Sequence, residues 1–184
     1  MKLKNTMQLG VMIFNLLSVS LVGAANIKPS DRYETKGSKT GLYIQSGYFT
    51  GGDKNVKTAE VIDVRRAWAK EGFERIVFEI KSHEKSPVAL PYFQAQLQNK
   101  EHRLVLSLWG NVASALGTDR LVKIFKKSKF VKSAQMFNQL EDGLSIIELA
   151  LQESASKSGL QFEAFFLQGP DRVVLDLKPL TGAR

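Results

Sequence analysis

The sequence predicts an all-β fold, a β-sandwich of two related antiparallel sheets, with one short helix or crossover between its halves. Three observations support this prediction. Short stretches of alternating apolar and polar residues recur from residue 59 onward, and turn residues such as Gly72, Gly110 and Gly169-Pro170 separate them. A strand-loop-strand pattern also occurs twice. Alternation with period two is typical of half-buried strands, and many such strands separated by turns indicate a sandwich or barrel.

The composition is that of a folded protein without disulfides. Of the 184 residues, 43% are hydrophobic and 24% are charged, which is typical of a globular domain. The chain has no cysteine, so disulfides, thiolate metal ligands and a catalytic thiol are excluded. The net charge of +8 favours anionic partners such as nucleic acid, anionic lipid or a cell-wall polymer.

Residues 1–25 have the features of a secretory signal peptide. Lys2 and Lys4 give a positive start, residues 9–22 are mostly apolar, and small residues follow up to Ala25. A retained membrane anchor is the alternative, but the apolar stretch is short for a bilayer core of about 30 Å. We therefore expect a periplasmic or secreted protein of the bacterial cell envelope that is not an integral membrane protein after cleavage. Export also argues against nucleic acid as the partner.

Residues 26–58 are predicted to be a flexible N-terminal segment or linker. Residues 35–41 are rich in Gly, Ser, Thr and Lys, a composition that favours flexible connections. Residues 42–49 are more apolar, and they either add an edge strand or lie against the domain that follows.

The β domain is predicted over residues 59–180, with half-repeats at about residues 59–111 and 130–180. Between them, Leu121, Val122 and Ile124 have helical spacing, which predicts a short helix or an irregular crossover. Each half-repeat carries four alternating apolar segments bounded by turn residues. The predicted strands are residues 60–68, 73–80, 92–97, 103–108, 131–137, 144–151, 162–167 and 172–177.

The last two strands of each half match at a spacing of 69 residues. Phe93 corresponds to Phe162, and Arg103 corresponds to Arg172. Alternation alone makes any two amphipathic hairpins similar, but the match includes Phe, Ala, Glu and Arg at a fixed phase, so we favour a structural repeat. The further matches without gaps are Ala95 with Ala164, Glu79 with Glu148, and Glu84 with Glu153.

The order of these motifs resembles the AMIN domain. The resemblance is carried by Val64-Arg65 with Trp68, by Glu74-Arg75-Ile76-Val77-Phe78-Glu79-Ile80, and by His102-Arg103-Leu104-Val105-Leu106-Ser107-Leu108. A second copy of the last motif is Pro170-Asp171-Arg172-Val173-Val174-Leu175-Asp176-Leu177, and the similarity covers residues 59–179. Ser107 departs from the family, which usually has Asp there, whereas Asp176 keeps the acid.

The resemblance implies a β-sandwich of two related sheets in a bacterial envelope protein. In cell-wall amidases an AMIN domain binds peptidoglycan and targets the enzyme to the septum. In secretin-type outer-membrane channels it anchors the channel to the wall. Both roles are binding roles, so the resemblance implies a module without catalytic residues.

The residues themselves also argue against catalysis, a metal and a cofactor. A catalytic zinc normally takes three protein ligands, and the chain has only two histidines, His83 and His102. The sequence has no nucleophile elbow and no phosphate-binding loop. Glycoside cleavage needs two carboxylates in a cleft, and Glu79 and Glu148 meet only the requirement for two carboxylates. We expect them to face solvent on matching strands.

A basic cluster is the first candidate binding site. Lysine ammonium groups attract the carboxylates and phosphates of envelope polymers, and salt weakens that attraction. A solvated face that keeps the protein soluble is an equally good interpretation. The residues of this cluster are Arg120, Lys123, Lys126, Lys127, Lys129 and Lys132.

Aromatic side chains are the second candidate, because their ring faces can stack on sugars. Trp68, Trp109 and Tyr92 lie at predicted strand ends, although burial in the core is the more frequent fate of such residues. Arg103 and Arg172 each begin a repeated strand, where each could pair with an acid across the sheet. We interpret both arginines and Asp176 as structural parts of the repeat.

Together these observations predict a non-catalytic module that binds peptidoglycan or another anionic envelope polymer. One alternative is a protein-interaction subunit that docks on a secretin, pilus or division complex through a sheet edge. A cell-wall enzyme with an unrecognised site is a second alternative.

Overall fold

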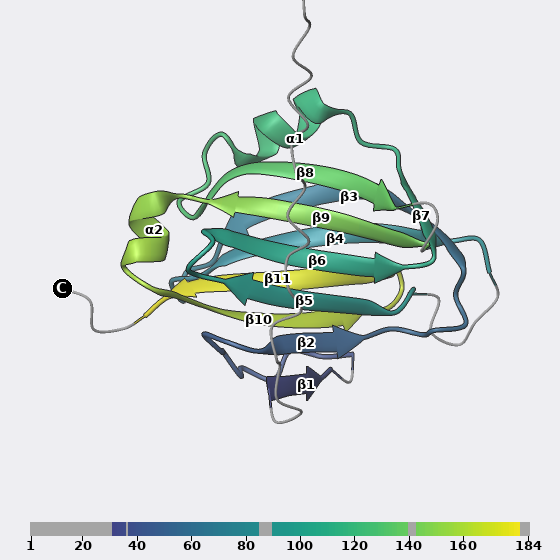
Figure 1. The fold of residues 1–184 in the computed structure, drawn as a ribbon, viewed down its shortest axis with the longest axis horizontal. Helices are drawn as coiled ribbons and strands as arrows, with labels where there is room; N and C mark the ends of the chain where they lie inside the picture. Colours follow the sequence, from purple (N-terminus) through teal and green to yellow (C-terminus); the bar gives the residue numbers. More distant parts are fainter. Residues whose placement is uncertain (1–30, 36, 85–89, 140–142, 181–184) are drawn as a thin grey trace, which may run out of the picture.

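The computed structural model describes residues 31–35, 37–84, 90–139 and 143–180. The predicted signal peptide, residues 1–25, lies outside the described residues. The described chain forms two packed β-sheets (Figure 1), which confirms the all-β sandwich. The elements are β1 (Arg32–Glu34), β2 (Tyr48–Gly51), β3 (Thr58–Trp68), β4 (Glu74–Ser82), β5 (Phe93–Gln98), β6 (Arg103–Trp109), β7 (Asn111–Ser114), α1 (Thr118–Phe125), β8 (Val131–Gln139), β9 (Leu144–Leu151), α2 (Glu153–Lys157), β10 (Leu160–Leu167) and β11 (Arg172–Pro179).

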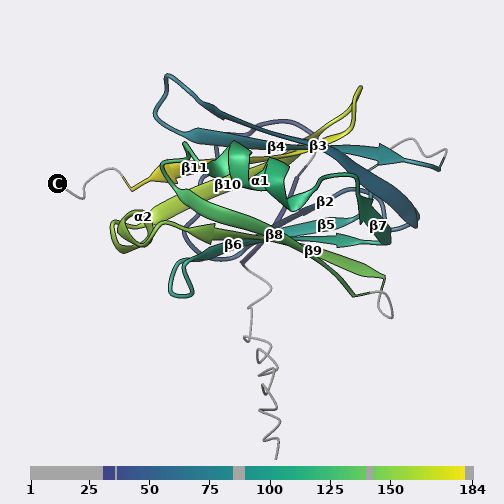
Figure 2. The same ribbon diagram turned by 90° about the horizontal axis from the view of Figure 1, so that it is seen from above.

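Each sheet combines strands from both halves of the chain. The six-stranded sheet has the order β1-β2-β5-β6-β9-β8, and the five-stranded sheet has the order β10-β11-β4-β3-β7. Seen from above, the two sheets form separate layers, and α1 lies over the opening between them (Figure 2). The sequence predicted antiparallel sheets, but both are mixed, because β1 pairs with β2 and β3 pairs with β7 in parallel.

The pairing registers show the predicted repeat. Phe93 pairs with Leu108 in the first hairpin, and Phe162 pairs with Leu177 in the second, each 69 residues later. The order β5-β6-β9-β8 in one sheet corresponds to β10-β11-β4-β3 in the other. The first strand of each half also carries a bulge at an equivalent place, between Val61 and Asp63 and between Val131 and Ser133.

The match without gaps does not extend to the glutamates. Arg172 pairs with Glu79, whereas Arg103 pairs with Ala150. Glu79 therefore corresponds to Ala150, and the predicted match of Glu79 with Glu148 is wrong. The connection between the second and third strands differs in length by two residues between the halves, so a fixed spacing cannot hold across it.

The core lies between the sheets and follows the alternation of the sequence. In β5 and β6 every second residue is buried, and the same holds for β9. Phe78, Phe93 and Phe162 are among the largest fully buried side chains. Burying one such side chain contributes roughly 1.5–3 kcal/mol, so the core compensates for the absence of disulfides. None of the described helices is long and apolar enough to cross a lipid bilayer.

Residues 37–46, predicted to belong to a flexible linker, lie against the five-stranded sheet; we call them the N-terminal strap. Ile44 exchanges two backbone hydrogen bonds with Phe162 on β10, at 2.9 Å each. The backbone N–H groups of Thr40 and Gly41 donate to Oε1 of Glu163, at 2.6 and 2.8 Å. These contacts tie the strap to the outer face of β10, so its Gly and Ser content does not leave it unattached.

Asp176 on β11 is the second buried acid beneath the strap. Its carboxylate accepts two hydrogen bonds from the Arg75 guanidinium, both at 2.7 Å, and one from Nζ of Lys39 at 2.8 Å. The Lys39 ammonium also lies 3.9 Å from the centre of the Phe73 ring. Since Asp176 is fully buried, this pairing is what offsets the cost of removing its charge from water.

We expect Asp176→Ser, which introduces the residue found at the equivalent Ser107, to lower the free energy of unfolding by about 2–3 kcal/mol. The substitution leaves Arg75 and Lys39 without their carboxylate. The reciprocal Ser107→Asp, on the other sheet, should change stability by less than about 1 kcal/mol. Urea unfolding measures both. Equal effects would mean that Asp176 does not hold the strap.

The Lys39 contact should also make stability depend on pH. Burial alone would lower the pKa of Lys39, but the hydrogen bond and the charge of Asp176 raise it above its usual 10.5. The folded state therefore binds this proton more tightly, and the stabilisation is complete below the unfolded pKa and lost as the pH rises through the folded one. The stability difference between wild type and Lys39→Met should be constant near neutral pH and shrink above about pH 10.5. The exposed Lys100→Met is the control, and a difference that grows with pH would contradict the assignment.

Candidate functional site

Two of the aromatic residues that were predicted as binding candidates meet at one end of the six-stranded sheet. Phe93 and Leu108 face the core and pair across the β5–β6 hairpin, so the residues just outside them, Tyr92 and Trp109, lie side by side. The N–H of Trp109 donates to the carbonyl of Tyr92 at 2.9 Å, and the ring centres are 5.2 Å apart. Both side chains are half-buried, so part of each ring is left for a ligand.

The two rings help to line a groove of about 580 Å³, which we call the Tyr92–Trp109 groove. The ammonium of Lys54 lies 5.2 Å from the centre of the Tyr92 ring, and Lys57 and Asn111 are exposed beside it. None of the described lining residues is acidic, so the groove presents positive charge. The remaining lining residues are Val56, Gln94, Gly110 and Gly143.

Backbone contacts fix the shape of this groove. Gly110 has φ +119°, and a Cβ there would lie 2.9 Å from the carbonyl oxygen of Lys57. Only glycine fits such a backbone without displacement. The N–H of Asn111 donates to that same carbonyl at 2.7 Å, and the N–H of Gly110 donates to Gly143 at 2.6 Å. The groove is therefore formed before a ligand binds.

The groove combines three kinds of chemistry within one concave surface. Ring faces offer apolar contact with a polar edge, lysines attract carboxylates or phosphates, and the Asn111 and Gln94 amides both donate and accept hydrogen bonds. Such a combination suits a ligand with flat apolar faces, hydroxyl groups and negative charge. A sugar polymer that carries carboxylates has these properties.

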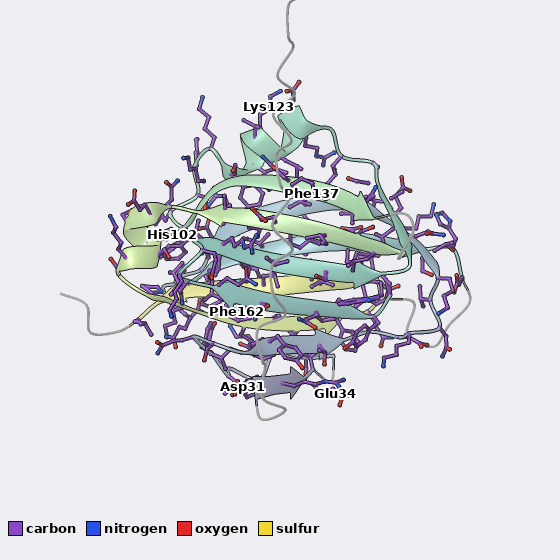
Figure 3. The ribbon with its side chains drawn as sticks, viewed as in Figure 1. Asp31, Glu34, His102, Lys123, Phe137 and Phe162 are labelled. Carbon is purple, nitrogen blue, oxygen red and sulfur yellow. The ribbon has the colours of Figure 1, made fainter. Side chains whose placement is uncertain are left out.

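The predicted basic cluster lies elsewhere, on α1 and the start of β8. Lys123 marks this region in Figure 3. The side chains of Lys123, Lys126, Lys127 and Lys132 are exposed and form no ion pair with any residue that the structure describes. We call these four residues the lysine edge.

The other two members of the predicted cluster have partners. Nη2 of Arg120 lies 2.6 Å from Oδ1 of Asp63 on β3, so part of its charge is neutralised. The ammonium of Lys129 lies 4.0 Å from the centre of the Trp68 ring, a cation–π contact. Trp68 also packs against Phe130 at 5.7 Å. Trp68 therefore belongs to the base of the lysine edge and is separate from the Tyr92–Trp109 groove.

A buried carboxylate fixes the connection between α1 and β8. Glu74 accepts hydrogen bonds from the hydroxyl of Ser128 at 2.9 Å and from the N–H of Phe130 at 3.3 Å, and it pairs with Arg66 at 2.7 Å. Arg66 in turn donates to the carbonyl of Ile124 at the end of α1. The lysine edge is thus held on a base that these hydrogen bonds and this ion pair fix in place.

The arginines of the repeat differ from one another. Arg103 pairs with Glu148 on β9 at 3.1 Å and donates to the amide of Gln98. Arg172 donates to the carbonyl of Pro170 at 3.1 Å, and it forms no ion pair with an acid in the described part of the chain. Glu79, its register neighbour, instead pairs with Arg65 at 3.0 Å. Within the described ranges, no three His, Asp or Glu side chains gather as a metal site would require.

Sequence reasoning missed Lys54, Lys57, Gln94 and Asn111 as neighbours of the aromatic pair. Lys54 and Lys57 follow the Gly51-Gly52-Asp53 turn and belong to the segment that was predicted to be a flexible linker. Their approach to Trp109 depends on the parallel pairing of β7 with β3, and no local pattern encodes that pairing.

No family model matches the chain, and no curated protein matches it. The resemblance to the AMIN domain therefore stays a prediction from the sequence motifs.

Proposed function

We propose that the protein is a non-catalytic binding module of the bacterial cell envelope and that it binds peptidoglycan in the Tyr92–Trp109 groove. The observation that carries the proposal is the meeting of two half-buried aromatic rings with two lysines and no described acid in one preformed groove. The predicted export signal and the resemblance to the AMIN domain support the same assignment.

The proposed ligand matches the groove in shape and in charge. Peptidoglycan is an extended polymer, so it needs an open groove at the molecular surface. The apolar faces of its sugar rings would lie on Tyr92 and Trp109, and the carboxylates of its stem peptides would lie near Lys54 and Lys57. Aromatic anchors of this kind carry a large share of the binding energy in many interfaces.

The groove is a better primary site than the lysine edge that the sequence suggested. The lysine edge offers mainly charge to a sugar, because the ammonium of Lys129 already lies 4.0 Å from the centre of the Trp68 ring. Charge alone attracts any polyanion and is screened by salt. The lysine edge would therefore contribute long-range attraction to sacculi, and the groove would contribute recognition.

We expect the purified protein to co-sediment with isolated sacculi and Trp109→Ala to weaken this binding about tenfold, equivalent to about 1.4 kcal/mol. Lys54→Gln combined with Lys57→Gln should weaken binding and reduce its salt dependence, because two charges facing the polymer are lost. Trp68→Ala is the matched control, since it removes a 42% exposed tryptophan outside the groove. Thermal unfolding of each variant checks that the fold is retained.

Two results would refute the proposal. The first is no enrichment of the wild-type protein on sacculi at low salt. The second is equal loss of binding in Trp68→Ala and Trp109→Ala, because it would place recognition outside the groove.

A further inference from the structure

The sandwich has one long sheet edge that no other strand covers. Among the described residues, β1 and β7 end their sheets with only three and four residues, and the strap bridges β10 at Phe162. The remaining edge, β8, has nine residues and pairs only with β9. An edge strand of this length presents unpaired N–H and C=O groups to any extended chain.

The protection that proteins usually give to such an edge covers only the first part of β8. The bulge between Val131 and Ser133, together with the exposed Lys132, lies at the start of the strand. Residues Ala134–Asn138 contain neither a charge nor a proline. A bulge and a charged side chain both discourage strand pairing, and the second part of β8 has neither. Helix α1 packs against β8 on the side of the five-stranded sheet, and no described strand pairs with this part of β8 other than β9.

A groove of about 410 Å³ runs beside this open segment. Leu116 and Leu121 line it on the side of α1, and Ala134 to Asn138 line it on the side of β8. Phe137, labelled on β8 in Figure 3, is 47% exposed, and Val122 on α1 is 56% exposed. Phe137 is thus an exposed large hydrophobic side chain on this edge, where it favours an apolar partner.

The charge around the groove selects among possible occupants. Exposed Lys123 on α1 and exposed Lys132 on β8 belong to the two elements that flank the groove. Neither lysine forms an ion pair with a described residue. Asp119 in the first turn of α1 is an acid on the same helix, but the four lysines of the lysine edge outnumber it. A second copy pairing through β8 would bring its own lysine edge and a net charge of +8 towards the first. Like charges oppose such an association, whereas an acidic chain complements it.

We propose that β8 is a docking site at which an extended acidic peptide segment of a protein partner adds a strand to the six-stranded sheet. The backbone of the segment hydrogen-bonds to Ala134–Asn138. One of its apolar side chains enters the groove between Leu116, Leu121 and Met136. Its acidic side chains lie near Lys123 and Lys132. Main-chain bonds give such added strands their affinity, and the side-chain groove gives them specificity.

This site shares no lining residue with the proposed peptidoglycan groove. The Tyr92–Trp109 groove lies where β6 ends, whereas β8 is the far edge of the same sheet beyond β9 (Figure 1). Loss of sacculus binding and loss of peptide binding therefore report on different surfaces.

The test uses the full chain and a synthetic ten-residue peptide of alternating valine and glutamate, with a valine–lysine peptide of the same length for comparison. The valine–glutamate peptide should bind and should slow hydrogen–deuterium exchange of amides within Ala134–Asn138. Lys132→Glu should weaken its binding about tenfold through lost attraction and new repulsion. Lys100→Glu, an equal charge change in the exposed β5–β6 loop, should change it less than about twofold. Phe137→Glu replaces an exposed side chain and should also abolish protection of β8.

Four outcomes would overturn the inference. They are no protection of β8 at millimolar peptide, protection confined to other strands, equal binding of the valine–lysine peptide, and equal weakening by Lys100→Glu and Lys132→Glu. Sedimentation of the protein alone adds a fifth outcome, because a dimer that Phe137→Glu dissociates would make a second copy the occupant of β8.

Discussion

The pairing of strands between the two halves of the chain is the constraint on which the rest of the structure depends. β6 of the first half pairs with β9 of the second, and β11 of the second half pairs with β4 of the first. Neither half completes a sheet without the other, so the core forms only when both are present. The same exchange brings Gly143, beside β9, to the end of β6, where its carbonyl receives the N–H of Gly110. The Tyr92–Trp109 groove is therefore a product of the joint between the halves.

The two halves share a scaffold but differ in the chemistry of their outer faces. In the second half, Glu163 and Asp176 point outward and are covered by the strap, whose Lys39 donates to Asp176 and whose Thr40 and Gly41 N–H groups donate to Oε1 of Glu163. The equivalent residues of the first half are Gln94 and Ser107, which are uncharged and half-exposed. A neutral face needs no covering segment to satisfy it. Gln94 is consequently available to line the groove. The two halves have diverged so that the strap covers the outer face around Glu163 and Asp176, while the equivalent face around Gln94 and Ser107 has no such cover from the strap.

The sequence was sufficient for the strands, and it was insufficient for the parts that tertiary contacts define. Alternation predicted all eight repeat strands, because burial between two sheets imposes a period of two on each of them. β1, β7 and α2 were missed, since three, four and five residues are too few to show a period. The contacts that hold the strap could not be predicted for another reason. Its composition suits a flexible linker, but the buried carboxylates that bind its backbone come from strands more than a hundred residues later.

Arginines and lysines differ in how often their charge is paired with an acid of the described chain. Arg65, Arg66, Arg75, Arg103 and Arg120 each form an ion pair with an acid in the described chain. A guanidinium suits such pairs, because its planar fork matches a carboxylate and is weakly hydrated. The lysines of the groove and of the lysine edge are unpaired by any described acid. Most of the arginine charge is therefore paired within the fold, with Arg172 as an exception, while the lysines of these two surfaces are available to an external partner. Because this charge lies at two separate places, one beside aromatic rings and one beside an open strand, each place can select a different anionic partner.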